Sequence, residues 1–194
     1  CALPISTARR GSAYAATGLD AGALLDAIAQ GTLTALPQAV TDDALTMIQT
    51  RDADILVELS PTNLDTAEPA TSHIRAALQR GMHVITANKG PAALHLKELR
   101  ALAVQQGVFL GIEGTVMAGT PSLRLGWSSL QGCDVRMVRG IVNGTTNYIL
   151  TKTSDEGLTY EEALEQAQQL GFAESNPTLD VKGFDAKFKL VILV

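Results

Sequence analysis

The chain has 194 residues, 46% of them hydrophobic and 18% charged, which is the composition of a globular protein long enough for one full domain and part of another. Its net charge of -5 argues against nucleic acid or a membrane surface as a partner, because either would require a basic face. The cysteines, Cys1 and Cys133, are too few for a disulfide scaffold and lack metal-ligand spacing, so we expect a reducing, cytoplasmic setting. No apolar run approaches the roughly 18 residues of a membrane span, and the apolar core of a signal peptide is missing.

Strands and helices alternate through the first part of the chain. Short apolar runs predict the strands, and longer stretches with an apolar stripe predict the helices. The expected strands are residues 2–6, 54–59, 83–87 and 108–112, and the expected helices are residues 19–29, 41–50, 69–80 and 91–106. This alternation predicts an α/β fold with a Rossmann-like, doubly wound parallel sheet, incomplete at its start. In such sheets ligands bind beyond the carboxyl ends of the strands.

The loops after two of these strands supply candidate cofactor contacts. Ser60 follows the strand at residues 54–59, although serine is also an ordinary turn residue. Arg9 and Arg10 follow the first strand, where a dinucleotide-binding fold carries an acid for the ribose of NAD or an arginine for the 2′-phosphate of NADP. An arginine pair without an acid favours NADP over NAD, and two solvated arginines are the alternative.

Lys89 follows the strand at residues 83–87, in the sequence Asn88-Lys89-Gly90. Most lysines in turns are solvated. This one stands where a parallel strand delivers its ligand contacts. We therefore consider Lys89 a candidate contact for both cofactor and substrate.

Small residues dominate the stretch from Glu113 to Pro121, and we place a domain boundary there, with residues 1–115 in one domain and 116–194 in the other. The carbonyl groups and the one carboxylate of this loop suit a hard cation, although small-residue loops usually bind none. The second domain is expected to be α+β. Its expected elements are helices at residues 122–130, 143–150 and 159–170 and an antiparallel strand at residues 135–142.

The helix that begins at Asn143 has free backbone N–H groups in its first turn, which favours binding of a carboxylate or phosphate. Capping by the threonine and asparagine residues explains the same sequence equally well. Thr159 and Glu162 have the spacing of a capping box at the start of the next helix.

Residues 171–189 are rich in acids and end in a lysine, and Pro177 and Gly183 prevent them from forming one helix. From Gly183 onward the sequence predicts a helix that buries an apolar side. Asp185 and Lys189 then lie one turn apart, in the favourable order for an ion pair. An isolated pair of this kind is normally solvated and contributes little.

The lysine is not isolated, because Glu174 and Asp180 lie just upstream. A free lysine has a pKa of about 10.4, too high for ready proton exchange at neutral pH, and burial or a nearby cation lowers the pKa of a lysine. Lys189 is therefore a candidate to take the proton of a substrate hydroxyl. Glu174 and Asp180 can hold a positively charged group, so we expect an amino acid rather than a plain alcohol as the small-molecule substrate.

Four motifs occur in order along the chain. They are ANKGP at residues 87–91, EGTVMAGTP at 113–121, NGTTNYIL at 143–150 and GFAE-x-NP-x-x-D-x-x-G-x-D-x-x-x-K at 171–189. Together they resemble the motifs of homoserine dehydrogenase, and the resemblance covers nearly the whole chain. It implies NAD(P)-dependent interconversion of L-homoserine and L-aspartate 4-semialdehyde in threonine and methionine synthesis, by a homodimer.

The same resemblance implies roles for individual residues. Lys189 would accept or return the proton of the substrate hydroxyl, and Asp185 would orient Lys189. Lys89 would contact the substrate carboxylate and the nicotinamide and would face Lys189 across a cleft. The implied substrate contacts are Glu174, Asp180, Gly144 and Thr145. The implied ligands of a monovalent cation, commonly sodium, are Glu113, Val116, Ala118 and Thr120.

Both ends of the chain look cut. The resembled family opens with a G-x-G-x-x-G turn for the cofactor pyrophosphate, which this sequence lacks, so we expect an internal fragment that ends just past Lys189. Two alternatives stay open. One is a dehydrogenase of the glucose-fructose oxidoreductase type, which would not need Glu174 and Asp180. The other is a non-catalytic fragment that binds no dinucleotide.

Overall fold

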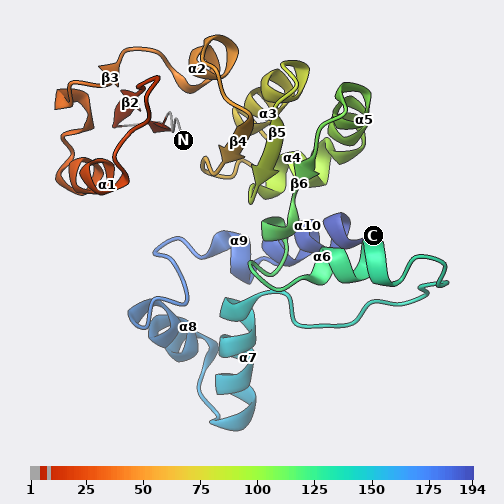
Figure 1. The fold of residues 1–194 in the computed structure, drawn as a ribbon. Coiled ribbons are helices and arrows are strands. Elements are labelled where there is room, and N and C mark those ends of the chain that lie inside the picture. Colours follow the sequence, from red (N-terminus) through yellow and green to blue (C-terminus); the bar gives the residue numbers. More distant parts are fainter. Residues whose placement is uncertain (1–4, 8–9) are drawn as a thin grey trace. The chain divides into compact units, whose positions relative to one another are not determined.

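The computed structural model describes residues 5–7 and 10–194 (Figure 1). The chain divides after Ile112 into two compact units. Within the described residues, no helix combines the length and the apolarity that crossing a bilayer requires.

A parallel sheet forms the centre of the first unit. Its strands are β4 (Ile55–Glu58), β5 (His83–Thr86) and β6 (Leu110–Gly111), in the order β4-β5-β6. Three helices flank it, namely α2 (Ala44–Thr50), α3 (Ala70–Gln79) and α5 (Leu96–Gln106). Helix α3 packs on β4 and β5, and α5 packs on β6 and α3. The predicted α/β fold with a parallel sheet is therefore confirmed (Figure 1).

The helices cover the sheet on one face. The core there contains Ile74, Leu78, Val84 and Leu99, each at most 1% exposed. The other face carries Ile55, Val57 and Ile85, which are 52%, 57% and 47% exposed. An uninterrupted apolar run such as residues 54–59 is typical of a strand that is buried on both faces, but the described residues cover only one face of β4, and its alternate side chains point to opposite faces.

The N-terminal strand does not join the parallel sheet. Strand β1 (Ile5–Thr7) pairs antiparallel with β2 (Gly11–Ala13), and β2 pairs antiparallel with β3 (Ala39–Val40). The expectation of a parallel second strand was wrong, because the short connection between Thr7 and Gly11 permits a hairpin, whereas a parallel pair needs a crossover of a dozen or more residues. Gly11 has a φ of 96°, which side-chain-bearing residues rarely adopt.

Helix α1 (Ala21–Gln30) and the 3₁₀ turn η1 (Leu33–Ala35) cover this small sheet. Leu24 and Leu33 pack with Ala13 in a second core, separate from that of the parallel sheet. An aspartate caps each of the helices α1 and α2. The carboxylates of Asp20 and Asp43 accept N–H groups in the first turns of α1 and α2, both at 2.7 Å.

The expected helix at residues 91–106 is two helices. Helix α4 (Lys89–Leu94) begins earlier and ends at His95, whose φ of -131° is not helical, and α5 follows directly. Helix α4 is capped by Asn88 instead of opening at Pro91. The motif at residues 87–91 therefore starts a helix directly after β5.

The second unit, all of which is described, consists of helices and loops. It opens with the 3₁₀ turn η2 (Glu113–Thr115) and α6 (Ser122–Arg124), which continues as the π-helical turn η3 (Leu125–Ser129). The remaining helices are α7 (Gly144–Asp155), α8 (Tyr160–Gln169), α9 (Thr178–Val181) and α10 (Phe184–Leu193). Its core is small and contains Ile149, Ala163, Ala167 and Ala173.

The strand expected at residues 135–142 is not formed. A strand needs a partner for its backbone hydrogen bonds, and no other strand occurs in this unit. Residues 131–141 are all exposed. The alternating sequence of this segment is compatible with a strand, but no partner for it is present.

The capping box predicted for α8 is confirmed. Glu162 accepts the backbone N–H of Thr159 at 2.9 Å and its hydroxyl at 2.8 Å, while the Glu162 N–H donates to the Thr159 hydroxyl oxygen at 3.3 Å. These hydrogen bonds, that from the Thr159 backbone first, hold the pKa of Glu162 below its ordinary value of 4.5. Because the folded pKa is lowered, the ionised Glu162 stabilises the folded state above about pH 4.5, and this contribution is lost as the pH falls through the folded pKa.

We therefore expect Glu162→Gln to lower the unfolding midpoint at neutral pH and to have little effect in acid. The single tryptophan, Trp127, lies in the second unit, so its fluorescence reports urea unfolding there. The neighbouring Glu161→Gln is the control, since Glu161 is not part of the capping box. A difference between wild type and Glu162→Gln that stays constant from pH 7 to pH 3 would contradict the capping argument.

Candidate active site

Asp185 and Lys189 form the predicted ion pair on α10. Lys189 Nζ lies 2.6 Å from Asp185 Oδ2, and it also donates to the carbonyl oxygen of Val142 at 2.6 Å. The two side chains are only 14% and 12% exposed. This pair is therefore largely withdrawn from water, unlike the solvated pair that is usual for this spacing.

The apolar side expected to be buried on α10 is exposed instead. Phe184, Leu190 and Val191 are 41%, 50% and 47% exposed, whereas Asp185 and Ile192 are buried. The reason is that the polar side of α10 has hydrogen-bond partners in the segment before α7. Asp185 accepts from Asn143, which caps α7, and Lys189 donates to Val142. The prediction of a buried apolar side was wrong, but Lys189 is shielded from water all the same.

Asn143 connects the two acids of the site. Its side-chain nitrogen donates to Asp180 Oδ1 and to Asp185 Oδ2, both at 2.8 Å. Its side-chain oxygen accepts the backbone N–H and the hydroxyl of Thr146, both at 2.9 Å, and so caps α7. Asn143 is 7% exposed and uses both ends of its amide.

Thr145 joins the same network from the first turn of α7. Its hydroxyl oxygen lies 2.6 Å from the carbonyl oxygen of Phe172 and 3.1 Å from Asp180 Oδ2. Its single proton can serve one of these acceptors at a time. Gly144 precedes it in the exposed first position of the helix. Thr145, Asp180, Asp185 and Lys189 are thus brought together as the sequence suggested.

Glu174 does not share in this network. Its side chain is exposed on the loop between α8 and α9, and its backbone carbonyl accepts Gln168 Nε2 at 3.1 Å. Asp180 also differs in setting from the expected bent loop, because it lies on α9, a single helical turn after Pro177. A role for Glu174 in holding substrate stays a prediction.

Asn143 was missed by the sequence reasoning as a member of the site. Its position at a helix start indicates a cap, and capping occupies only the side-chain oxygen. The use of the amide nitrogen depends on α9 and α10, which lie more than thirty residues further along the chain. An N-cap asparagine followed later in the chain by a cluster of acids is the sequence signal that could have found it.

In the first unit, Ser60 and Lys89 lie at the carboxyl ends of β4 and β5. Asn88 caps α4 by accepting the N–H of Gly90 at 3.2 Å, and it donates to the carbonyl oxygen of Ser60 at 3.1 Å. Lys89 is the partly buried first residue of α4. A Cβ atom on Gly90 would lie 2.6 Å from the backbone oxygen of Asn63, so only glycine fits there.

The arginine candidates have a different setting. Arg10 follows β1 and donates to the carbonyl oxygen of Ile28 in α1 at 2.5 Å. This hydrogen bond ties the hairpin to the last turn of α1. Arg9 lies outside the described residues, and a role of either arginine at a 2′-phosphate stays a prediction.

The candidate cation loop contains an acid with a structural task. The Glu113 carboxylate accepts the backbone N–H groups of Leu123 and Arg124, both at 3.0 Å, and so holds the start of α6. Of the candidate carbonyl ligands, that of Val116 accepts the hydroxyl of Ser122 at 3.2 Å. Ala118 has a φ of 51°, and Thr120 is exposed. Among the described residues no cluster of three or more acidic, histidine or cysteine side chains could hold a metal.

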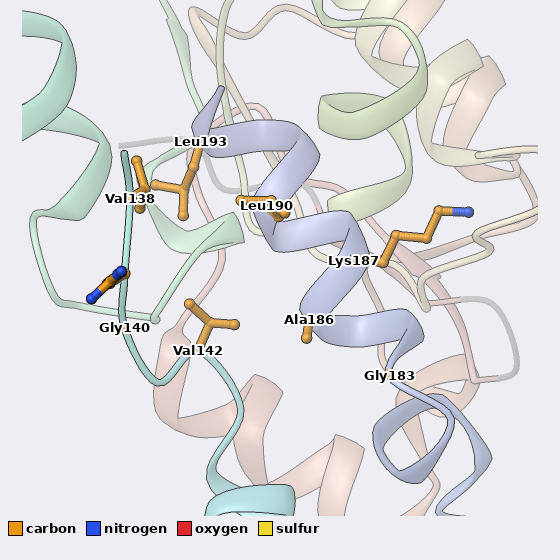
Figure 2. A pocket seen from close by; sticks show the side chains of 9 residues that line it. Val138, Gly140, Val142, Gly183, Ala186, Lys187, Leu190 and Leu193 are labelled. Atoms are coloured by element: carbon orange, nitrogen blue, oxygen red, sulfur yellow. The ribbon is translucent and has the colours of Figure 1, made fainter. Parts of the chain in front are cut away.

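A groove of about 660 Å³ runs between α10 and the extended segment before α7 (Figure 2). Figure 2 shows Val138 and Val142 on one side and Leu190 and Leu193 on the other. Lys187 extends away from both valines. Lys189 and Asp185 do not line the groove, but Val142 does, and its carbonyl oxygen accepts the hydrogen bond from Lys189.

Two family models match the chain in succession. The NAD-binding domain of homoserine dehydrogenase matches residues 19–113, and homoserine dehydrogenase matches residues 121–194. The chain belongs to the homoserine dehydrogenase family. This assignment favours homoserine dehydrogenase over the sugar-oxidoreductase alternative.

Individual homoserine dehydrogenases agree with the assignment. The NAD(+)-dependent homoserine dehydrogenase of Pseudomonas canavaninivorans is 47% identical over 186 residues, 94% of this chain and 52% of the relative. That of Methanocaldococcus jannaschii is 46% identical over 150 residues, 77% of this chain and 45% of the relative. The chain therefore spans about half the length of the curated relatives that it matches.

Solved structures of homoserine dehydrogenases share the fold. A hyperthermophilic archaeal homoserine dehydrogenase in complex with NADPH is 30% identical with a TM-score of 0.84, over 98% of this chain and 58% of that one. The enzyme from Thiobacillus denitrificans is 35% identical with a TM-score of 0.73, over 88% and 38% of the two chains. Both matches extend across the two units, so the Rossmann-like fold is shared with this family.

Proposed function

We propose that this chain is part of an NAD(P)-dependent homoserine dehydrogenase that interconverts L-homoserine and L-aspartate 4-semialdehyde in threonine and methionine synthesis. The observation that carries the proposal is the buried network in which Lys189 is paired with Asp185 and connected through Asn143 to Asp180. In this family, an amine held by two acceptors beside further acids suits the removal of a proton from an amino-acid hydroxyl.

The proton chemistry follows from how Lys189 is held. Asp185 and the carbonyl oxygen of Val142 fix its nitrogen, so a neutral amine there can accept the proton of the substrate hydroxyl in one direction and return it in the other. Asp180 and Glu174 would hold the substrate ammonium group by charge-assisted hydrogen bonds. Gly144 and Thr145 would contact the substrate at the first turn of α7.

The dinucleotide is expected at the carboxyl ends of β4 and β5. The residues there fit such a ligand, because the hydroxyl oxygen of Ser60 is buried and has no hydrogen-bond partner among the described residues. A nicotinamide cofactor, when bound, supplies the acceptor or donor of the hydride at the substrate carbon. Lys89 would contact both cofactor and substrate.

The remaining assignments follow from the family. We propose that residues 1–115 are part of a cofactor domain and residues 116–194 part of a catalytic domain. The enzyme would be a cytoplasmic homodimer formed through the second domain. A monovalent cation such as sodium would bind carbonyl groups of the loop that follows Glu113. Either NAD or NADP fits the proposal, since one relative is named NAD(+)-dependent and one similar structure holds NADPH.

The test is oxidation of L-homoserine by a full-length enzyme that carries this sequence, followed by the absorbance of reduced nicotinamide. We expect turnover with homoserine and none with glucose. Turnover with glucose alone would contradict the proposal and favour a sugar oxidoreductase. A fluorescence titration of the 194-residue chain with NADPH asks separately whether this polypeptide binds dinucleotide by itself.

A further inference from the structure

Four polar residues close a ring of hydrogen bonds at the carboxyl ends of β4 and β5. Glu58 Oε1 accepts the backbone N–H of Ser60 at 2.8 Å, and Glu58 Oε2 accepts the hydroxyl of Thr86 at 2.9 Å. The Thr86 oxygen accepts the backbone N–H of Asn88 at 2.9 Å. Asn88 Nδ2 then donates to the carbonyl oxygen of Ser60 at 3.1 Å, which completes the ring.

The ring fixes the two turns that carry the candidate cofactor contacts. Both backbone groups next to the Ser60 side chain are bound, its N–H by Glu58 and its C=O by Asn88. Asn88 also caps α4, whose first residue is Lys89. The hydroxyl of Ser60 and the start of α4 are therefore tied to one carboxylate.

Glu58 is the member of the ring that is hardest to replace. It is 3% exposed, and a buried carboxylate costs free energy unless it is hydrogen-bonded. Its two partners in the ring, an N–H and an O–H, are both donors, and a carboxylate accepts from both. The amide of glutamine offers only one accepting oxygen, so it leaves one of these donors without a partner. Thr86 is one of these two donors and is 2% exposed, so bulk water does not replace an acceptor that its hydroxyl loses.

We propose that Glu58 is a positioning residue for the dinucleotide. It does not contact the cofactor. It holds two turns in the arrangement that binds the cofactor. One is the turn of Ser60, whose buried hydroxyl has no partner among the described residues, and the other is the turn of Lys89. This inference rests on the proposed function only in requiring that the full-length enzyme binds a dinucleotide.

The test compares variants of the full-length enzyme by fluorescence titration with NADPH and by steady-state kinetics. Glu58→Gln and the isosteric Thr86→Val both cut the ring, and each is expected to raise the Kd and the KM for the dinucleotide about 10- to 100-fold. The KM for homoserine should rise less than the KM for the dinucleotide, because the ring reaches a proposed substrate contact only through the Lys89 turn, and kcat at saturating dinucleotide should change little. Thr86→Ser keeps the hydroxyl and should retain wild-type affinity. Glu98→Gln is the control, because Glu98 is exposed and pairs only at the surface of the same unit.

The outcomes separate this inference from the proposed function. Dinucleotide binding without homoserine oxidation in the wild type overturns the proposed function and leaves the ring testable by titration. Wild-type affinity in Thr86→Val overturns the inference, even if Glu58→Gln fails to fold. A wild type that binds no dinucleotide overturns it too. An equal loss of affinity for dinucleotide and homoserine in the ring variants also overturns it, since a general structural defect would produce that pattern.

Discussion

Replacing Lys189 with methionine is expected to lower kcat for homoserine oxidation by about 10²- to 10⁴-fold, the usual contribution of a positioned acid or base. Methionine keeps much of the apolar stem of lysine but removes the amine that Asp185 and the Val142 carbonyl hold. The dinucleotide Kd should change little, because the substitution removes no residue of the first unit. Steady-state kinetics and an NADPH titration of the full-length enzyme measure the two effects separately.

Lys187→Met is the matched control. Lys187 lies two residues earlier on α10, is exposed, and points away from Val138 and Val142 (Figure 2). The Lys187→Met substitution makes the same change of charge and side chain on the same helix, at a position outside the ion-pair network. Similar losses of kcat in Lys187→Met and Lys189→Met would mean that the amine of Lys189 has no special role. An unchanged kcat in Lys189→Met would end its assignment as the proton acceptor.

The parallel part of the fold was predictable from sequence because its elements are local. The apolar runs that became β4, β5 and β6 and the helices between them have the lengths and periodicities of a βαβ fold, and the structure confirms their order. Pairing was harder to predict. The first strand pairs antiparallel with the strand that begins at Gly11, and the segment at residues 135–142 has no partner strand. Both outcomes depend on what lies beside each segment and not on the pattern of its own sequence.

The site shows the same division between local and distant information. The Asp185 and Lys189 spacing on a helix predicted their ion pair, and the motif order predicted that Thr145 and Asp180 belong with them. The connecting residue Asn143 and the ring around Glu58 were not predicted, because their partners are distant in sequence. The prediction for α10 placed the buried side of the helix wrongly. A hydrophobic pattern predicts that apolar residues are buried, and it does not show which polar side chains are buried by their hydrogen-bond partners.

Asn143→Asp should be strongly destabilising although it is nearly isosteric. Aspartate preserves the cap of α7, because it can still accept the N–H of Thr146. It replaces the nitrogen that lies 2.8 Å from both Asp180 and Asp185 with an oxygen that cannot donate to either. Loss of two donors to acids in a buried setting, with a third negative charge added, should lower the unfolding free energy of the second unit by about 2–5 kcal/mol.

Urea unfolding followed by the fluorescence of Trp127 measures this change. Asn147→Asp is the control, because it adds the same charge at an exposed position of α7, where an acid near the helix start is tolerated or favourable. If the two variants unfold at the same urea concentration, Asn143 does not hold the acids together. The double variant Asn143→Asp with Asp180→Asn restores an amide opposite a carboxylate at that contact. It should recover part of the lost stability, and this coupling in a double-mutant cycle would assign the effect to the Asn143–Asp180 hydrogen bond itself.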